Sequence, residues 1–512
     1  MSSSEISTPS LSDSSLTGRA AVQWLLGSIL VLAPLFRSGQ PALAVLVLEL
    51  LAVAVLVLVL WSAQRHRVSS WEALAVTLLA AVPLLYLVPL PGGLTQSVSA
   101  WQPYLAAQSL MGDSAGEGLQ RLSIYPLETE SAWLFLLVPI AVFLGTRLLD
   151  TRRVLQLVLL LLGIGAVQAL LGLLQYGAGA GSPELFGLSL AEIRSAVGTY
   201  TNRNHLAGLL EMLLPVALAL MFYSVGRDRR DGRRDWRDRV AFLGSVRGHA
   251  AVVYGAIALL LLVGVIFTRS RAGITLSMLG VLLSTLLFAR RIGGDNVYGP
   301  TGTVVAFAVG IGVAIGLVPV LDRFSVEGAV NDARWTIYAS TADGIGAFSP
   351  LGSGPGTYPD VFPAYQPLEL GRWFINHAHN DYLEWLFEGG LLAAALICLL
   401  LLLYARQWFA VWTRDAWLHF RFVQVGAGIG ILLLLLHSLV DFNLHIPANI
   451  AYLAFLAGVF FARPDTDAEP ARRRRRRTPD LEESETASQT SLGEASATPP
   501  PDQIRNPFLD GD

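Results

Sequence analysis

The chain has 512 residues, of which 53% are hydrophobic and only 15% are charged. Ordinary soluble domains carry about 25% charged residues. Here the apolar residues fall into blocks of about 17–25, the length that crosses a lipid bilayer. This composition excludes a soluble globular enzyme, a secreted disulfide-linked protein and a disordered chain. The single cysteine, Cys398, has no second thiol to pair with, and the net charge of −3 says little because the charges are segregated.

Twelve apolar blocks are candidate membrane spans. Because a segment inside a bilayer must satisfy its backbone hydrogen bonds internally, each block is expected to be a helix. The expected spans are residues 20–36, 41–62, 71–90, 132–149, 154–177, 205–224, 250–268, 272–289, 302–320, 389–405, 422–440 and 447–462. The sequence therefore predicts an all-α polytopic membrane protein whose transmembrane domain covers residues 19–463.

The distribution of arginine predicts the orientation of these spans. All 36 basic residues are arginine. If the N-terminus is cytoplasmic and the spans alternate, 27 arginines fall in cytoplasmic segments and nine fall outside. This asymmetry agrees with the positive-inside rule and places both termini in the cytoplasm. The long outer segments are then residues 91–131, 178–204 and 321–388.

The two ends of the chain differ in composition from the transmembrane domain. Residues 1–18 are rich in Ser and Thr and predict a short disordered tail. Residues 464–512 are rich in Ser, Thr, Pro and Glu and predict a second disordered tail. This tail contains the polybasic stretch 472–477, which either attracts anionic lipid headgroups or simply fixes the topology.

The outer segment 321–388 is long enough to need structure of its own. Within it Trp335, Tyr338, Ala342 and Ile345 recur at helical spacing. We therefore expect short helices in this segment, including one that lies on the membrane surface.

Three outer arginines lie at the ends of spans. Arg203 lies at the outer end of the sixth span, and Arg269 and Arg271 lie in the very short link between the seventh and eighth spans. A charge close to the hydrocarbon is costly, so these side chains require a partner. A guanidinium group pairs bidentately with phosphate and stays protonated, which suits a lipid-linked phosphate or pyrophosphate. The alternative is that each arginine reaches ordinary lipid headgroups or a nearby carboxylate.

A polar segment leads directly into the tenth span and contains His377, His379, Asp381, Glu384 and Glu388. In one continuous helix, all of these except His379 would form a single polar stripe, and His379 would point elsewhere. An imidazole titrates near neutrality and can accept a proton from a hydroxyl group. Two alternatives remain: a polar interface helix without catalytic function, and a metal site built from His377, His379 and Asp381.

Two further polar signals are weaker. The glycine-rich stretch Gly352–Gly356 follows no predicted strand and opens no helix, so it predicts a hinge or tight turn rather than a phosphate loop. Asp441, Asn443 and His445 lie between the last two spans, with His437 nearby. They either line a polar cavity or belong to an ordinary short link.

Several of these motifs together resemble the O-antigen ligase superfamily. They are the Arg203 motif, the link Thr268–Gly273, and the stretch Pro350–Tyr358 followed by His377–Trp385. The superfamily contains bacterial inner-membrane O-antigen ligases, O-antigen polymerases and protein O-oligosaccharyltransferases. The resemblance extends over about residues 70–460.

The resemblance implies a GT-C-like membrane glycosyltransferase that needs no metal and no cofactor. It implies transfer of a glycan from an undecaprenyl-pyrophosphate carrier to an acceptor hydroxyl at the periplasmic face. In the family, arginines matching Arg203 and Arg271 engage the pyrophosphate, and the histidine matching His379 acts on the acceptor. The family pattern continues to Gly390, but it prefers Gly, Thr or Tyr where this chain has Ala393. This departure leaves the subfamily open.

Five other residues are expected as helpers around these three: Arg269, Arg334, His377, Asn380 and Asp381. The expected partners are the lipid-linked glycan donor, a hydroxyl acceptor on lipid A core, glycan or protein, and membrane lipids. No nucleic acid is expected. A base attacking opposite the leaving group would invert the anomeric centre.

Three alternative functions remain open at this stage. A polymerase of the same superfamily would differ from a ligase only in its acceptor. A transporter, like the inorganic-carbon transporters described among relatives, needs polar groups near the membrane midplane, where Glu49 and Glu211 are the main candidates. A non-catalytic protein would bind lipid-linked sugar without turnover.

Overall fold

The computed structural model describes residues 11–62, 68–91, 98–110, 119–178, 195–226, 236–292, 297–315, 333–413 and 419–463. The predictions for residues 1–10, 179–194, 316–332 and 464–512, including the polybasic stretch 472–477, lie outside these ranges. Helices dominate the described residues. Within them the only strand pair is short, with β1 (Leu90–Pro91) antiparallel to β2 (Leu119–Gln120).

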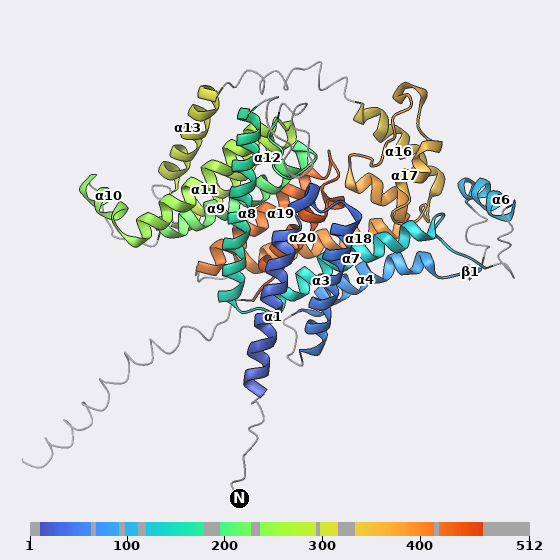
Figure 1. Cartoon of the computed structure of the whole chain (residues 1–512), viewed down its shortest axis with the longest axis horizontal. Helices are drawn as coiled ribbons and strands as arrows, with labels where there is room; N and C mark the ends of the chain where they lie inside the picture. The colour runs from blue at the N-terminus through green and yellow to red at the C-terminus, as the bar shows by residue number, and fades with distance from the viewer. Residues whose placement is uncertain are drawn as a thin grey trace, which may run out of the picture. The chain divides into compact units, whose positions relative to one another are not determined.

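Twelve apolar helices of the described chain fall on the twelve expected spans (Figure 1). They are α1 (Leu11–Leu32), α3 (Ala42–Trp61), α4 (Ser70–Leu87), α7 (Pro126–Leu148), α8 (Thr151–Ala178), α9 (Arg203–Gly226), α11 (Val246–Thr268), α12 (Arg271–Ile292), α13 (Tyr298–Ile315), α18 (Asp381–Trp412), α19 (His419–His437) and α20 (Pro447–Phe460). Nine are long and apolar enough to cross a bilayer, and α1, α13 and α20 contribute shorter apolar stretches. The all-α polytopic membrane fold is thus confirmed.

Several of these helices begin earlier than the hydropathy pattern predicts, and the difference is largest for α1 and α18. α1 begins at Leu11 and α18 at Asp381, whereas their apolar blocks begin near residues 20 and 389. Short helices outside the segment 321–388 are α2 (Leu35–Ser38), α6 (Gln102–Leu110), α10 (Trp236–Leu243) and the 3₁₀ turns η1 (Ser99–Trp101) and η9 (Asn443–His445).

α9 is the most enclosed of the membrane helices, with 94% of its most apolar window buried. Its sequence is apolar on every side, which is typical of a helix surrounded by other helices. It packs against α11, α12 and α19, which lie beside it in Figure 1. Glycine allows the closest approach: a Cβ at Gly430 of α19 would overlap the carbonyl of Met212 in α9.

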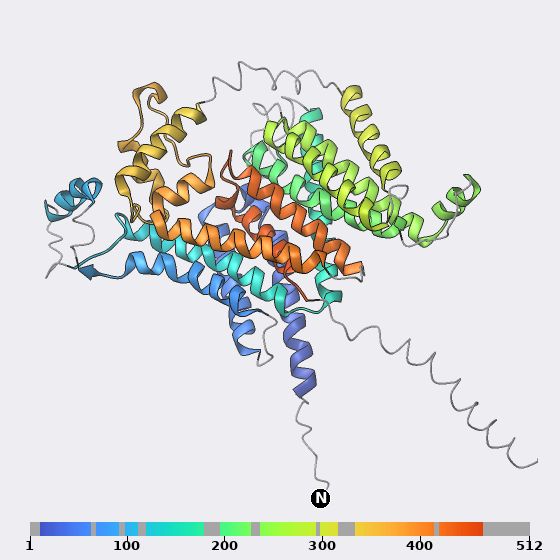
Figure 2. The same cartoon turned by 180° about the vertical axis from the view of Figure 1, so that it is seen from behind.

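The described part of the longest segment between spans folds against α18. It contains α16 (Arg334–Phe348), α17 (Tyr358–Val361) and the turns η7 (Phe362–Ala364) and η8 (Leu368–Leu370). These elements share a small hydrophobic core that includes Ile337, Phe348, Tyr358, Phe362 and Phe387. α16 packs on α18, as Figure 2 shows for the gold and orange helices. The short helix expected around Trp335–Ile345 is therefore confirmed.

The glycine-rich stretch folds back onto the beginning of α18. Gly352 and Gly354 have φ angles of +82° and +114°, a conformation that favours glycine. The amide of Gly354 donates to the carbonyl of Glu388 over 2.8 Å, and a Cβ at Gly352 would overlap that same carbonyl. Gly390, with a φ of +50°, then interrupts the helical conformation of α18. The stretch is a tight turn, as expected, and it holds the first turns of α18 in place.

Candidate functional site

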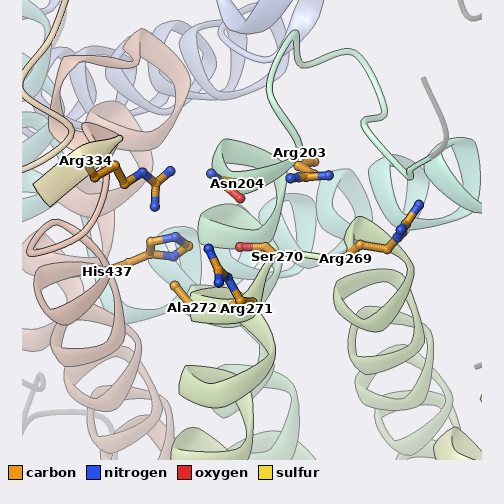
Figure 3. Close-up of a pocket in the computed structure, with 8 residues that line it drawn as sticks. All are labelled: Arg203, Asn204, Arg269, Ser270, Arg271, Ala272, Arg334 and His437. Carbon is orange, nitrogen blue, oxygen red and sulfur yellow. The ribbon is translucent and has the colours of Figure 1, made fainter. Parts of the chain in front are cut away.

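Eight residues from four separate parts of the chain line a cavity of about 230 Å³, which we call the arginine cavity (Figure 3). They are Arg203, Asn204, Arg269, Ser270, Arg271, Ala272, Arg334 and His437. Four of these side chains are guanidinium groups, and none of the eight is a carboxylate. The volume has room for several water molecules. Its lining suits an anion of moderate size.

Three helices begin at this cavity, and each has an arginine as its first residue. Arg203 begins α9, Arg271 begins α12 and Arg334 begins α16. A helix N-terminus carries partial positive charge, so these three ends add to the attraction of the side chains for an anion. The structure thus brings together two arginines expected to bind pyrophosphate and a third expected as a helper.

Local capping explains why two of these helices begin where they do. The side-chain oxygen of Asn202 accepts a hydrogen bond from the amide of Asn204 over 2.8 Å at the start of α9. The hydroxyl of Ser270 accepts one from the amide of Gly273 over 3.2 Å at the start of α12. Asn and Ser are favoured at this position because their oxygens satisfy amides that have no partner within the helix.

Arg269 also lines the cavity but is placed differently. It closes the C-terminus of α11 with a left-handed φ of +57°. In Figure 3 its guanidinium group is turned away from Arg271. It therefore contributes positive charge at one edge of the cavity rather than at its centre.

Asp441, in the link between α19 and α20, joins this cavity to the histidine segment. Its buried carboxylate accepts a hydrogen bond from Asn204 Nδ2 over 2.6 Å and pairs with Arg334 Nη2 at 3.3 Å. On its other oxygen it lies 3.4 Å from His379 Nδ1 and 3.6 Å from His205 Nε2. One carboxylate therefore contacts two residues of the cavity and the expected base.

The charge state of Asp441 follows from these contacts. Burial alone would raise the pKa of Asp441, but its contacts with His205 and His379 and the charge of Arg334 hold it well below its usual value. Asp441 is thus ionised at neutral pH and can orient the positively polarised groups around it.

His379 is held in an uncommon backbone conformation. Its φ is +52°, in the left-handed region that few non-glycine residues adopt. Tyr338 of α16 donates a hydrogen bond to the backbone carbonyl of His379 over 2.7 Å. The imidazole ring of His379 lies edge-on to Phe442. If Nδ1 donates to Asp441, Nε2 becomes the basic nitrogen of the ring. Strain of this kind is concentrated at functional sites.

His377 and His379 have different partners. Because α18 begins only at Asp381, the expected continuous polar stripe does not form, and His377 precedes the helix. His377 Nδ1 nevertheless reaches Glu384 Oε1 at 2.8 Å and its ring stacks on Phe442. The expected separation of the two imidazoles is seen, but the continuous helix behind that expectation was wrong.

A second polar cluster forms around Glu384. His377, Glu384 and His445 present ligand atoms within 4.8 Å of one another, so they are the group in the described chain that could hold a divalent cation. The combination expected from sequence, His377 with His379 and Asp381, is not the one the fold assembles. Asp381 instead accepts a hydrogen bond from His445 Nδ1 over 2.7 Å and another from the amide of Leu444 over 3.0 Å.

His445 carries positive charge in this cluster. Burial would lower the pKa of His445, but the carboxylates of Glu384 and Asp381 raise it to about 10. The imidazolium thereby ties the start of α18 to the link before α20. We call His377, Asp381, Glu384 and His445 the histidine–carboxylate cluster.

Asn380 has a clear local role. It is the N-cap of α18, where its side-chain oxygen accepts hydrogen bonds from the amides of Tyr382 and Leu383 over 3.0 and 3.1 Å. Its Nδ2 donates to the carbonyl of Leu439 over 2.9 Å. Asn380 therefore fixes both the start of the helix and the position of the adjacent His379.

An apolar cavity of about 180 Å³ adjoins the histidine–carboxylate cluster. Apolar side chains of α4, α7 and α18 form most of its lining, among them Leu79, Phe135 and Leu396. His377, Glu384 and His445 close its polar end. The two cavities thus differ in chemistry, one strongly cationic and one largely apolar.

Sequence reasoning treated Asp441 and His445 as weak signals, and the structure gives them the most contacts of any polar residues in their link. The available signal was the concentration of His437, Asp441, Asn443 and His445 within a few residues between two apolar spans. Hydropathy alone could not show which distant helix ends they meet.

Comparison with models of protein families matches residues 256–398 to the family described as O-antigen ligase. This region contains Arg271, Arg334 and His379, whereas Arg203 and Asp441 lie on either side of it. No curated protein matches the chain.

Proposed function

We propose that the chain, whose residues 256–398 match the O-antigen ligase family, transfers a glycan from undecaprenyl pyrophosphate to an acceptor hydroxyl. One observation carries the proposal: three helix-leading arginines line a single cavity, and Asp441 connects that cavity to His379. A cationic cavity supplies the leaving-group site, and the adjacent imidazole supplies the base.

The arginine cavity would act on the leaving group. As the bond between the anomeric carbon and the pyrophosphate oxygen breaks, negative charge grows on the pyrophosphate. Guanidinium groups and helix N-termini held in place before the reaction stabilise that charge without reorganising. Arg203 and Arg271 are the proposed pyrophosphate ligands, and Arg334 supports them while paired with Asp441.

His379 would act on the acceptor. Its Nε2 accepts the hydroxyl proton while the acceptor oxygen forms a bond to the anomeric carbon, and undecaprenyl pyrophosphate departs. The resulting imidazolium is stabilised by the ionised Asp441. A base on the face opposite the leaving group gives inversion at the anomeric carbon. The proposed reaction at the arginine cavity and His379 uses no metal ion.

The proposed role of the arginine cavity also implies an orientation of the protein in the membrane. We propose that the protein is a multi-pass protein of the bacterial inner membrane, with both termini cytoplasmic and the arginine cavity on the periplasmic side. The acceptor is lipid A core, a second carrier-linked glycan or a protein hydroxyl. Glu211, a candidate for a transport path, is paired with His437 at 2.8 Å instead of facing an open route.

Reconstitution tests this function directly. The purified protein in liposomes receives a lipid-pyrophosphate glycan and each candidate acceptor, and product length is measured: one added block indicates a ligase, and a ladder indicates a polymerase. His379→Ala should lower transfer by about 10²–10⁴-fold, the usual contribution of a positioned base. His249→Ala, which alters an exposed histidine at the start of α11, is the matched control. Full transfer by His379→Ala would refute the base assignment.

A further inference from the structure

A buried polar pair inside the helix bundle takes no part in the reaction described above. Glu211 of α9 and His437 of α19 meet at 2.8 Å between Oε1 and Nδ1, with side-chain exposures of 0% and 1%. Both side chains lie among apolar helices. Burying such a pair carries a large desolvation penalty, and packed apolar residues often give equal stability. Stability is therefore a weak explanation for the pair.

His437 is at the same time part of the arginine cavity. It is the last residue of α19, and its ring points toward the space shared with Arg271 and Arg334 in Figure 3. Its Nε2 is buried and has no hydrogen-bond partner among the described residues. A buried ring nitrogen without a partner is costly, and the ring that carries it lines the cavity.

The charges around His437 indicate which kind of ligand group suits its Nε2. An imidazolium beside three arginines would be repelled, but the carboxylate of Glu211 on the opposite ring nitrogen compensates for its charge. The C-terminus of α19 also favours a cation at this position. With Nδ1–H directed to Glu211, Nε2–H is the donor that remains for a ligand of the cavity that this ring lines. A donor in this position recognises an anionic oxygen.

We propose that His437, oriented by Glu211, donates its Nε2–H to a diphosphate oxygen bound in the arginine cavity. This inference rests on the proposed function, in which that cavity holds the carrier pyrophosphate. His437 is then a binding residue for the diphosphate, and Glu211 is a positioning residue that acts through it. No proton is transferred, because the hydrogen bond serves to hold and neutralise the leaving group.

The test measures binding of undecaprenyl pyrophosphate to the full chain in nanodiscs, with inorganic pyrophosphate as a competitor. His437→Leu should weaken binding at least about tenfold, as expected for loss of a hydrogen bond to a charged group. Glu211→Gln retains an acceptor for Nδ1 but removes the negative charge, and it should weaken binding severalfold. Competition by inorganic pyrophosphate at similar concentrations assigns recognition to the diphosphate, and its failure to compete would overturn that assignment.

Two reference variants separate this inference from the proposed function. Gln424→Leu alters another buried polar residue of α19, outside the cavity lining, and should leave binding unchanged. Arg271→Gln removes a guanidinium group from the cavity and shows whether the cavity itself contributes to binding. If Arg271→Gln weakens binding but His437→Leu and Glu211→Gln match the wild type, the role of His437 is overturned and the proposed function stands. If the wild type does not bind the lipid, both are overturned.

The melting temperature without ligand identifies a purely structural role. Glu211→Gln should change the ligand-dependent increase in melting temperature more than the melting temperature of the ligand-free protein. A fall confined to the ligand-free melting temperature, with normal affinity, would contradict the proposal. Because Glu211→Gln keeps the hydrogen bond to the ring, it serves as the test even if His437→Leu fails to fold.

Discussion

The arginine cavity and the histidine–carboxylate cluster both contact the link between α19 and α20, but their charged groups are arranged differently. In the cavity, guanidinium groups and helix N-termini face a common space, and the buried Nε2 of His437 has no partner in the described chain. In the cluster, His377 pairs with Glu384 and His445 pairs with Asp381.

This difference distinguishes a site suited to binding a ligand from one whose polar groups pair with one another. Several cationic groups that line one cavity attract an anion, whereas paired imidazoles and carboxylates stabilise one another. Asp441 and Phe442 stand between the two regions: Asp441 contacts His379, and Phe442 packs against both His377 and His379. We therefore assign chemistry to the cavity side and structural support to the cluster.

Among changes to the link and to the cluster, Asp441→Asn should have the largest effect on activity. The amide keeps the size of the side chain but loses the charge that orients His379 and pairs with Arg334. We expect glycan transfer to fall by about 10²-fold, the lower end of the contribution of a positioned base. Transfer rates of the reconstituted protein measure this change. Asp360→Asn, at an exposed aspartate of α17, is the control, and near-normal rates for Asp441→Asn would contradict the role of Asp441.

Glu384→Gln should affect stability and spare carrier binding. The change leaves the imidazolium of His445 with one carboxylate fewer, and loss of a buried charged partner costs about 1–3 kcal/mol. The free energy of unfolding should fall accordingly, while the affinity for undecaprenyl pyrophosphate stays within twofold or so of the wild type. A tenfold loss of affinity for undecaprenyl pyrophosphate at unchanged stability would show that the cluster takes part in binding the carrier.

The cluster also predicts a dependence of stability on pH. The pKa of His445 is raised to about 10 in the folded protein, against about 6.5 in an unfolded chain. Its contribution to stability is therefore complete below about pH 6.5 and is lost as the pH rises through about 10. Melting temperatures between these pH values should decline more steeply for the wild type than for His445→Gln. Equal slopes would show that His445 is not the titrating group.

Chelation should have the smallest effect. Guanidinium groups and an imidazole supply the proposed chemistry, so EDTA should leave the transfer rate of the reconstituted protein unchanged. Loss of activity on chelation, with recovery on adding a divalent cation, would instead identify His377, Glu384 and His445 as a metal site. Glu384→Gln would then abolish that recovery.

The sequence predicted the helices well because their signal is local. Apolar blocks of bilayer length identify the spans, and arginines on the outer side identify Arg203 and Arg271 as residues that need a partner. The start of α18 was placed too late because hydropathy begins after the polar first turns. Asn380, a favoured N-cap, was the signal for the true start.

The contacts of Asp441 could not be predicted in the same way. It meets Asn204, Arg334 and His379, which come from three other parts of the chain. No spacing rule connects residues so far apart, and only the packing of α9, α16 and α18 around the link brings them together. The pair Glu211–His437 was hidden for the same reason, since each side chain alone is an isolated polar group in an apolar helix.

A structure determined with bound undecaprenyl pyrophosphate would test the central claim most directly. We predict that the diphosphate lies in the arginine cavity, with its oxygens at hydrogen-bonding distance, about 2.7–3.2 Å, from Arg203 and Arg271. His379 would face the departing glycan from the other side of Asp441. A diphosphate seated at the histidine–carboxylate cluster, or at the opposite membrane face, would contradict the account.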